Sequence, residues 1–247
     1  MSEKPQKIQL FHTCLVNEFY PEVGMAVVNV LEHLGIEVNV PLRQTCCGQP
    51  AYNTGFQKDA KKAARYTVEL LSKTEGPIVI PSGSCTDMII HQYPILFRED
   101  TDFLPEVTAV TKRCYEFTQF LVDVLGVSKL GARLDARAAY HQSCHLLRGL
   151  GIKKQPASLL ENIENLKIMT IEEKDECCGF GGTFAAKHPD ISGSIMQKKI
   201  RNIENSKADM VVSCDMGCLM HLEGGLHRKG STIKLRHIAQ VLEAGLQ

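Results

Sequence analysis

The sequence of 247 residues has no excess of charge of either sign, because 28 lysine and arginine residues balance 28 aspartate and glutamate residues. A balanced chain lacks the broad basic field that holds nucleic acid and the polybasic segment that binds a membrane surface. No apolar run approaches the roughly 20 residues that a membrane-spanning helix needs. Residues 1–10 are charged and lack the apolar stretch of a secretory signal, so we expect a cytoplasmic protein.

What the sequence has in unusual number is cysteine. The composition is otherwise that of a globular protein, with 44% apolar and 23% charged residues, and the length allows one large domain or two small ones. The ten cysteines are unexpected in a chain that shows no sign of secretion. Disulfides are rare in a reducing compartment, so the cysteines indicate metal binding or redox chemistry.

The cysteines form a pattern that occurs twice. Each half of the chain has an adjacent pair followed by glycine, with one cysteine about 30 residues before the pair and another about 40 residues after it. The offsets between the halves are 130, 131, 131 and 133 residues. The corresponding positions are Cys14 and Cys144, Cys46 and Cys177, Cys47 and Cys178, and Cys85 and Cys218. Such agreement indicates an internal duplication.

The segments between these cysteines predict alternating strands and helices. The expected strands are residues 7–13, 36–40, 78–81, 137–142, 166–171 and 209–213. Apolar residues at helical spacing lie between them. Strand–helix–strand order predicts parallel strands with right-handed crossovers, in which all the carboxyl ends meet at one edge. The predicted fold class is therefore α/β: two pseudo-repeated parallel-sheet βαβ domains with cysteine loops at the C-terminal strand ends.

The expected domains are residues 1–105 and 136–247, joined by a helical linker over 106–135. Within the linker, the spacing predicts a helix over 107–125, with Cys114 on its apolar face. Cys114 has no counterpart in the other half, so we expect it to be a buried apolar residue.

The adjacent cysteines favour a metal over a disulfide. Neighbouring Cα atoms are about 3.8 Å apart, whereas an ordinary disulfide needs about 4.4–6.8 Å. Two adjacent thiolates can instead bind one metal centre, and the following glycine would let the backbone pass closely beside a bulky ligand. Four thiolates suit zinc or an iron–sulfur cluster. Widely spaced ligands favour the cluster, while zinc and thiol redox chemistry stay open.

Four histidines lie near the cysteines in sequence: His12, His141, His145 and His221. A histidine can ligate a cluster or hydrogen-bond to a sulfur and so change its potential. The simpler interpretation is that each is a polar neighbour without a role in ligation.

Four segments carry a resemblance to a known family: 46–53, 81–85, 177–184 and 217–220. They resemble the cysteine-rich CCG domain, which is found twice in one of the subunits of heterodisulfide reductases and in the glycolate oxidase iron–sulfur subunit. The likeness covers nearly the whole chain and is greatest to the lactate utilization protein A family, whose members have two such domains.

The resemblance implies one or two iron–sulfur clusters, of the 4Fe-4S type, and a role in electron transfer. The chain would serve an oxidoreductase system that converts L-lactate to pyruvate, together with other proteins of the lactate utilization system, and would have no substrate site of its own. The implied ligands are Cys14, Cys46, Cys47, Cys85, Cys144, Cys177, Cys178 and Cys218, with Cys214 as a further candidate.

The sequence departs from the family pattern at its final C-x-x-C. Ser82 stands where the first of these cysteines would be in one half, and Asp215 stands there in the other, next to Cys214. The first half thus offers four cysteines, so zinc is an alternative in the first domain. Two other functions stay open: a zinc-stabilised scaffold, and a disulfide reductase subunit that uses thiols or a cluster.

Overall fold

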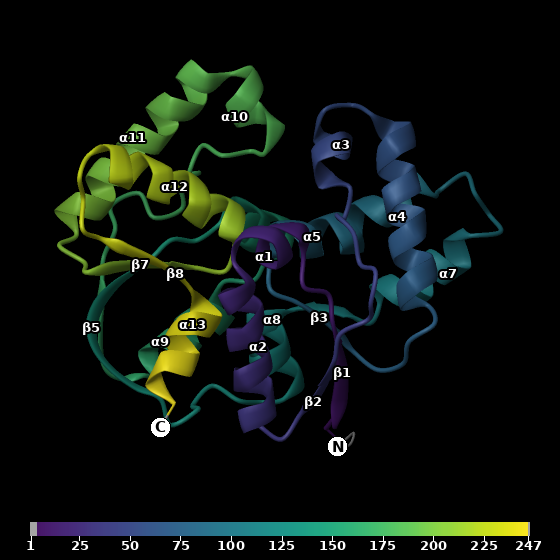
Figure 1. Ribbon diagram of the computed structural model, residues 1–247, viewed down its shortest axis with the longest axis horizontal. Coiled ribbons are helices and arrows are strands. Elements are labelled where there is room, and N and C mark those ends of the chain that lie inside the picture. The colour runs from purple at the N-terminus through teal and green to yellow at the C-terminus, as the bar shows by residue number, and fades with distance from the viewer. Residues whose placement is uncertain (1–3, 247) are drawn as a thin grey trace. The chain divides into compact units, whose positions relative to one another are not determined.

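The computed structural model describes residues 4–246, so the first three residues of the charged N-terminal segment lie outside it. The chain divides into two compact units, the first ending at Leu125 and the second beginning at Gly126. Each unit contains one four-stranded parallel sheet with helices on both faces (Figure 1). The predicted α/β class of two repeated parallel-sheet domains is confirmed.

The sheet of the first unit has the strand order β2-β1-β3-β4. The strands are β1 (Lys7–Leu10), β2 (Glu37–Asn39), β3 (Ile78–Ile80) and β4 (Cys114–Glu116). The longer helices are α2 (Pro21–His33), α4 (Gln57–Leu71) and α7 (Leu104–Thr111). The shorter helical segments are α1 (Cys14–Phe19), α3 (Gln49–Asn53), α5 (Gly83–Asp87), η1 (Met88–Gln92), α6 (Tyr93–Leu96), α8 (Phe117–Gln119) and η2 (Phe120–Val124).

The periodicity of the sequence explains the two long crossover helices. In α4, the buried positions Ala60, Ala64, Val68 and Leu71 recur every three or four residues, which gives the helix one apolar face. Helix α2 ends just before Gly35, whose φ of +76° lies in the left-handed region that favours glycine.

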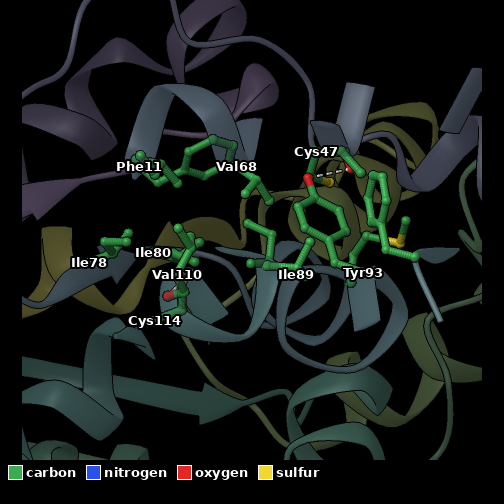
Figure 2. Close-up of a cluster of buried hydrophobic side chains, with 14 of the residues drawn as sticks. Phe11, Cys47, Val68, Ile78, Ile80, Ile89, Tyr93, Val110 and Cys114 are labelled. Carbon is green, nitrogen blue, oxygen red and sulfur yellow. Dashed lines mark hydrogen bonds between the residues drawn. The ribbon is translucent and has the colours of Figure 1, made fainter. Parts of the chain in front are cut away.

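The core of the first unit reaches the first cysteine pair. Figure 2 shows buried side chains from β3, α4 and the segment after α5, with Tyr93 beside Cys47. The Tyr93 hydroxyl donates a hydrogen bond of 2.9 Å to the carbonyl oxygen of Cys47. Tyr93 is fully buried, so the packing of the core fixes the backbone at the cysteine pair.

The second unit has the same strand order, β6-β5-β7-β8. Its strands are β5 (Arg133–Tyr140), β6 (Glu164–Met169), β7 (Met210–Ser213) and β8 (Lys234–His237). Its helices are η3 (His145–Gly149), α9 (Lys154–Glu161), α10 (Thr183–Lys187), α11 (Pro189–Asn205), α12 (Met216–Arg228) and α13 (Ile238–Gly245). Right-handed crossovers put α11 and α12 on one face and α9 on the other, where α13 joins it (Figure 1).

The expected helix over 107–125 is wrong. Strand β4 interrupts it and pairs in register with β3, Ile78 opposite Cys114. The helix restarts at α8 because Glu116 and Gln119 form a capping box, in which the buried Glu116 carboxylate accepts hydrogen bonds from the new helix. Residues 106–125 therefore belong to the first unit. Cys114 is buried, as expected of an apolar residue.

No helix within residues 4–246 combines the length and the hydropathy that crossing a membrane requires.

Candidate metal centres

Three loops of the first unit bring four cysteines together at the carboxyl ends of its strands. Cys14 begins α1 after β1, the pair Cys46 and Cys47 lies between β2 and α3, and Cys85 lies in α5 after β3. The Sγ atoms of Cys47 and Cys85 are 3.5 Å apart. Since β1 and β3 are neighbours whose connections run to opposite sides, the cysteines meet where α/β sheets usually form their sites.

The thiols of the first unit form a hydrogen-bonded chain in the order Cys14, Cys46, Cys47, Cys85. Hydrogen bonds from Cys14 and Cys47, and from the Gly48 backbone, stabilise the thiolate of Cys46 and hold its pKa well below the usual range. The pKa of Cys14 and that of Cys47 are raised, chiefly by the same contacts with Cys46. Cys46 is therefore the thiol whose ionised form its neighbours favour.

The second unit repeats this arrangement with Cys144, Cys177, Cys178 and Cys218. The Sγ atoms of Cys178 and Cys218 are 3.1 Å apart. Hydrogen bonds from Cys144 and Cys178 lower the pKa of Cys177, and the Gly179 backbone N–H donates a further bond of 3.3 Å to its sulfur. The structure therefore gathers the four predicted cysteines of each half into one cluster.

The donor set of both clusters fits a cationic group. None of the ten cysteines, all of which lie among the described residues, forms a disulfide, and sulfur separations of 3.1–3.5 Å are far longer than the roughly 2.05 Å of a disulfide. Thiolates gathered so closely repel one another unless a cation neutralises them. A metal group would supply that positive charge, since thiolates are ligands of zinc and of iron–sulfur clusters.

The glycine after each cysteine pair packs closely against a helix. Gly48 and Gly179 have φ values of +84° and +91°; Gly48 packs against the backbone of α4, and Gly179 packs against that of α11. A β-carbon on Gly179 would lie 2.6 Å from the carbonyl oxygen of Ser192, and one on Gly48 would lie 3.2 Å from that of Ala60. The close approach is thus to a helix, and it anchors the cysteine loop to the domain.

Cys214 lies outside the four-thiol chain of the described residues. Its sulfur is 3.6 Å from the Tyr140 hydroxyl, and it is fully buried. Beside it, Asp215 caps α12 by accepting a hydrogen bond of 3.0 Å from the backbone N–H of Gly217. In the first unit, Ser82 caps α5 in the same way: its hydroxyl oxygen accepts a hydrogen bond of 3.2 Å from the backbone N–H of Cys85. The two residues that replace family cysteines are therefore helix caps.

Of the four histidines considered from the sequence, His141 alone joins a group of candidate ligands in the described residues. Its ring, Cys178 Sγ and Cys218 Sγ have donor atoms within 4.8 Å of one another. Burial lowers the pKa of His141 to about 4, and the charge of Lys199 acts in the same direction, so the imidazole is neutral at pH 7. By contrast, His221 contacts Ser192 Oγ at 3.3 Å, and its ring packs beside Phe180.

Lys199 is a functional candidate that the sequence analysis missed. It lies on the apolar face of α11 and is only 1% exposed. Its ammonium group donates a hydrogen bond of 2.8 Å to the carbonyl oxygen of Glu173. Burial lowers its pKa, while Cys178 and Cys177 lie close enough to act on it electrostatically. The sequence does contain a sign of this burial: Lys199 lies between Met196 and Ile203 at helical spacing, where an apolar residue is expected.

Two α/β units of one topology, each with four thiols at the strand ends, define a tandem cysteine-rich protein. The sequence pattern of the cysteine-rich domain, CCG, matches residues 8–90 and 138–223. The chain is 45% identical to lactate utilization protein A 2 of Bacillus cereus over 97% of its length and 99% of that protein. It is 44% identical to lactate utilization protein A of an Exiguobacterium species, over 97% of this chain and 98% of that protein. The chain belongs to this family of paired CCG-domain proteins.

The fold also occurs in a solved structure of low sequence identity. A hypothetical protein from Helicobacter pylori superposes with a TM-score of 0.67 at 13% identity, over 99% of this chain. This chain spans 50% of that longer protein, and the likeness concerns the fold alone.

Proposed function

We propose that this chain is an iron–sulfur electron-transfer protein of a system that oxidises L-lactate to pyruvate. The observation that carries the proposal is the cluster of four hydrogen-bonded thiols in each unit. The relatives named lactate utilization protein A support the assignment to lactate. The other proteins of that system are its proposed partners, and a cytoplasmic location is proposed with them.

The proposed ligands are Cys14, Cys46, Cys47 and Cys85 for the first centre, and Cys144, Cys177, Cys178 and Cys218 for the second. An iron–sulfur cluster, of the 4Fe-4S type, supplies one-electron chemistry when bound. The chain surrounds the inner thiols of Cys47, Cys178 and Cys218 with the domain core, where they are buried. The remaining five thiols are partly exposed, which leaves each centre an edge for exchange of electrons with a partner.

The first test is the metal content of protein purified without oxygen. We expect iron and acid-labile sulfide in equal amounts, roughly four or eight of each per chain, and a brown colour that bleaches on reduction. Zinc without sulfide, persisting after an attempt to reconstitute clusters, would overturn the proposal and favour a zinc-stabilised scaffold.

The second test concerns lactate. The oxidised protein is mixed anaerobically with the partner proteins of the lactate utilization system, and its visible absorption is followed. We expect bleaching when L-lactate is added and none when lactate or the partners are omitted. Bleaching with glycolate but not with L-lactate would contradict the substrate assignment and leave the electron-transfer role intact.

A further inference from the structure

His141 is a fully buried histidine with no hydrogen-bond partner for either ring nitrogen among the described residues. It follows β5, and its donor atoms, the Sγ of Cys178 and the Sγ of Cys218 lie within 4.8 Å of one another. A buried polar group left without a partner costs about 1–3 kcal/mol. The protein tolerates this cost beside the thiols of the second unit, which indicates that a ring nitrogen binds something there.

The first unit has no such group at the same position. Backbone hydrogen bonds show that Phe11 is the matching residue. The N–H of Phe11 donates a hydrogen bond of 3.0 Å to the carbonyl oxygen of Val79, and the N–H of His141 donates one of 2.8 Å to the carbonyl oxygen of Val212. Each of these two residues follows the central strand of its sheet and lies three residues before a clustered cysteine. Phe11 is buried in the apolar core that Figure 2 shows, so it offers the first centre no ligand atom.

Imidazole is the ligand chemistry that fits this site. A histidine nitrogen is among the commonest metal ligands in proteins, and it binds iron and zinc alongside thiolates. Donor atoms that share one metal group must lie within a few ångströms of one another, as these three do. A solvent-facing role is excluded, because the ring is fully buried.

We propose that His141 is a ligand of the metal group in the second unit, through an imidazole nitrogen, together with the thiolates of that unit. This inference rests on the proposed iron–sulfur function. The first centre is bound by thiolates alone.

The decisive experiment uses the unaltered protein. It is produced with natural and with ¹⁵N-labelled histidine, loaded with iron and sulfide, partly reduced, and examined by pulsed electron paramagnetic resonance. We expect a strong nitrogen coupling on one of the two reduced signals, which changes from a ¹⁴N to a ¹⁵N pattern on labelling. Iron in both units without any nitrogen coupling would overturn the inference while leaving the proposed function standing. Absence of iron–sulfur clusters would overturn the proposed function itself.

Variants assign the coupling to a residue. In His141→Phe, which copies the first unit, the nitrogen coupling disappears, while the first centre is unchanged. In His141→Cys, which offers a thiol at the same place, the second centre is retained without the nitrogen coupling. The matched control is His221→Phe, which alters a half-buried histidine of the same unit and keeps the coupling. Persistence of the coupling in His141→Phe, or its loss in His221→Phe, would contradict the assignment.

Discussion

Gly225 of α12 lies so close to Met196 of α11 that a β-carbon on the glycine would be 2.8 Å from the methionine sulfur. Because the Cδ1 atom of Ile200 in α11 would lie closer still to that β-carbon, Gly225→Ala forces the side chains packed between α11 and α12 out of their positions. We expect a loss of roughly 1–3 kcal/mol of stability, measured as the free energy of unfolding of the metal-loaded protein.

The adjacent glycine supplies the control for that substitution. A β-carbon on Gly224 would meet only the end of Arg228, at 3.8 Å. Gly224→Ala therefore stabilises the helix by about 0.5–1 kcal/mol, because alanine loses less backbone entropy on folding. Equal effects of the two substitutions would show that the helices are not in the close contact described.

The packing of Gly179 leads to a second prediction, about loss of metal. Gly179→Ala combines a positive φ with a contact of 2.6 Å to the Ser192 carbonyl oxygen, so the Cys178 loop must move away from α11. We expect the second centre to lose iron, measured by iron content and by its spectrum. Gly151→Ala shares the positive φ but meets nothing within 4 Å, so it loses some stability and keeps its iron.

A substitution of Ser82 tests whether this residue acts as a helix cap or as a metal ligand. Ser82→Ala removes the hydrogen bond to Cys85 N at the start of α5, which costs about 1 kcal/mol. Iron content stays unchanged, because Ser82 is a cap rather than a ligand. Loss of the first centre's iron at unchanged stability would instead place the Ser82 hydroxyl on the metal group.

Cysteine substitutions test the proposed ligand sets one unit at a time. Cys178→Ser removes a thiol at the centre of the second cluster, and we expect the iron content to fall by about half. The matched variant Cys114→Ser also alters a buried cysteine, but one whose sulfur contacts the Val110 carbonyl oxygen and no clustered thiol. It keeps full iron content. The same iron content in Cys178→Ser and Cys114→Ser would contradict the assignment of Cys178 as a ligand.

The ion pair between Arg137 and Asp209 predicts a dependence of stability on pH. Hydrogen bonds of 2.6 and 3.0 Å from the guanidinium lower the pKa of the Asp209 carboxyl below its ordinary value. A lowered pKa in the folded state gives stability that is present above the unfolded value and is lost as pH falls through the folded value. Asp209→Asn is therefore less stable than the parent at pH 7, and the difference disappears in strong acid.

That comparison is made by chemical unfolding of the metal-free protein, which avoids acid release of the cluster. Arg137→Gln serves as the partner control, since it removes the guanidinium but keeps the backbone N–H that also donates to Asp209, so its dependence on pH is smaller than that of the parent. A difference between Asp209→Asn and the parent that is constant from pH 7 to pH 2 would show that the contact does not affect the carboxyl group.

The sequence predicts the repeated parts of the fold because their signals are strong. The four duplicated cysteines and the spacing of Ala60, Ala64 and Val68 need no knowledge of distant contacts. The sequence does not predict strands β4 and β8, because they have only three or four residues and are defined by pairing with a neighbouring strand. Local periodicity favoured a helix through Cys114, and the capping by Glu116 overrode it.

The sequence likewise predicts only part of the candidate metal centres. Loop convergence follows from parallel topology, so the eight clustered cysteines were predicted from their place after strands. The contrast between His141 and Phe11 was not, because it depends on the register of β5 against β7 and of β1 against β3. The burial of Lys199 depends in the same way on carbonyl groups about 25 residues away in sequence.

Each sheet draws its strands from one uninterrupted stretch of chain, the first complete at Glu116 and the second beginning at Arg133. During synthesis, the ribosome therefore releases every strand of the first sheet before any of the second. Domains of this kind fold as units, N-terminal first. The first set of thiols is therefore brought together by a unit that can fold while the second unit is still being translated.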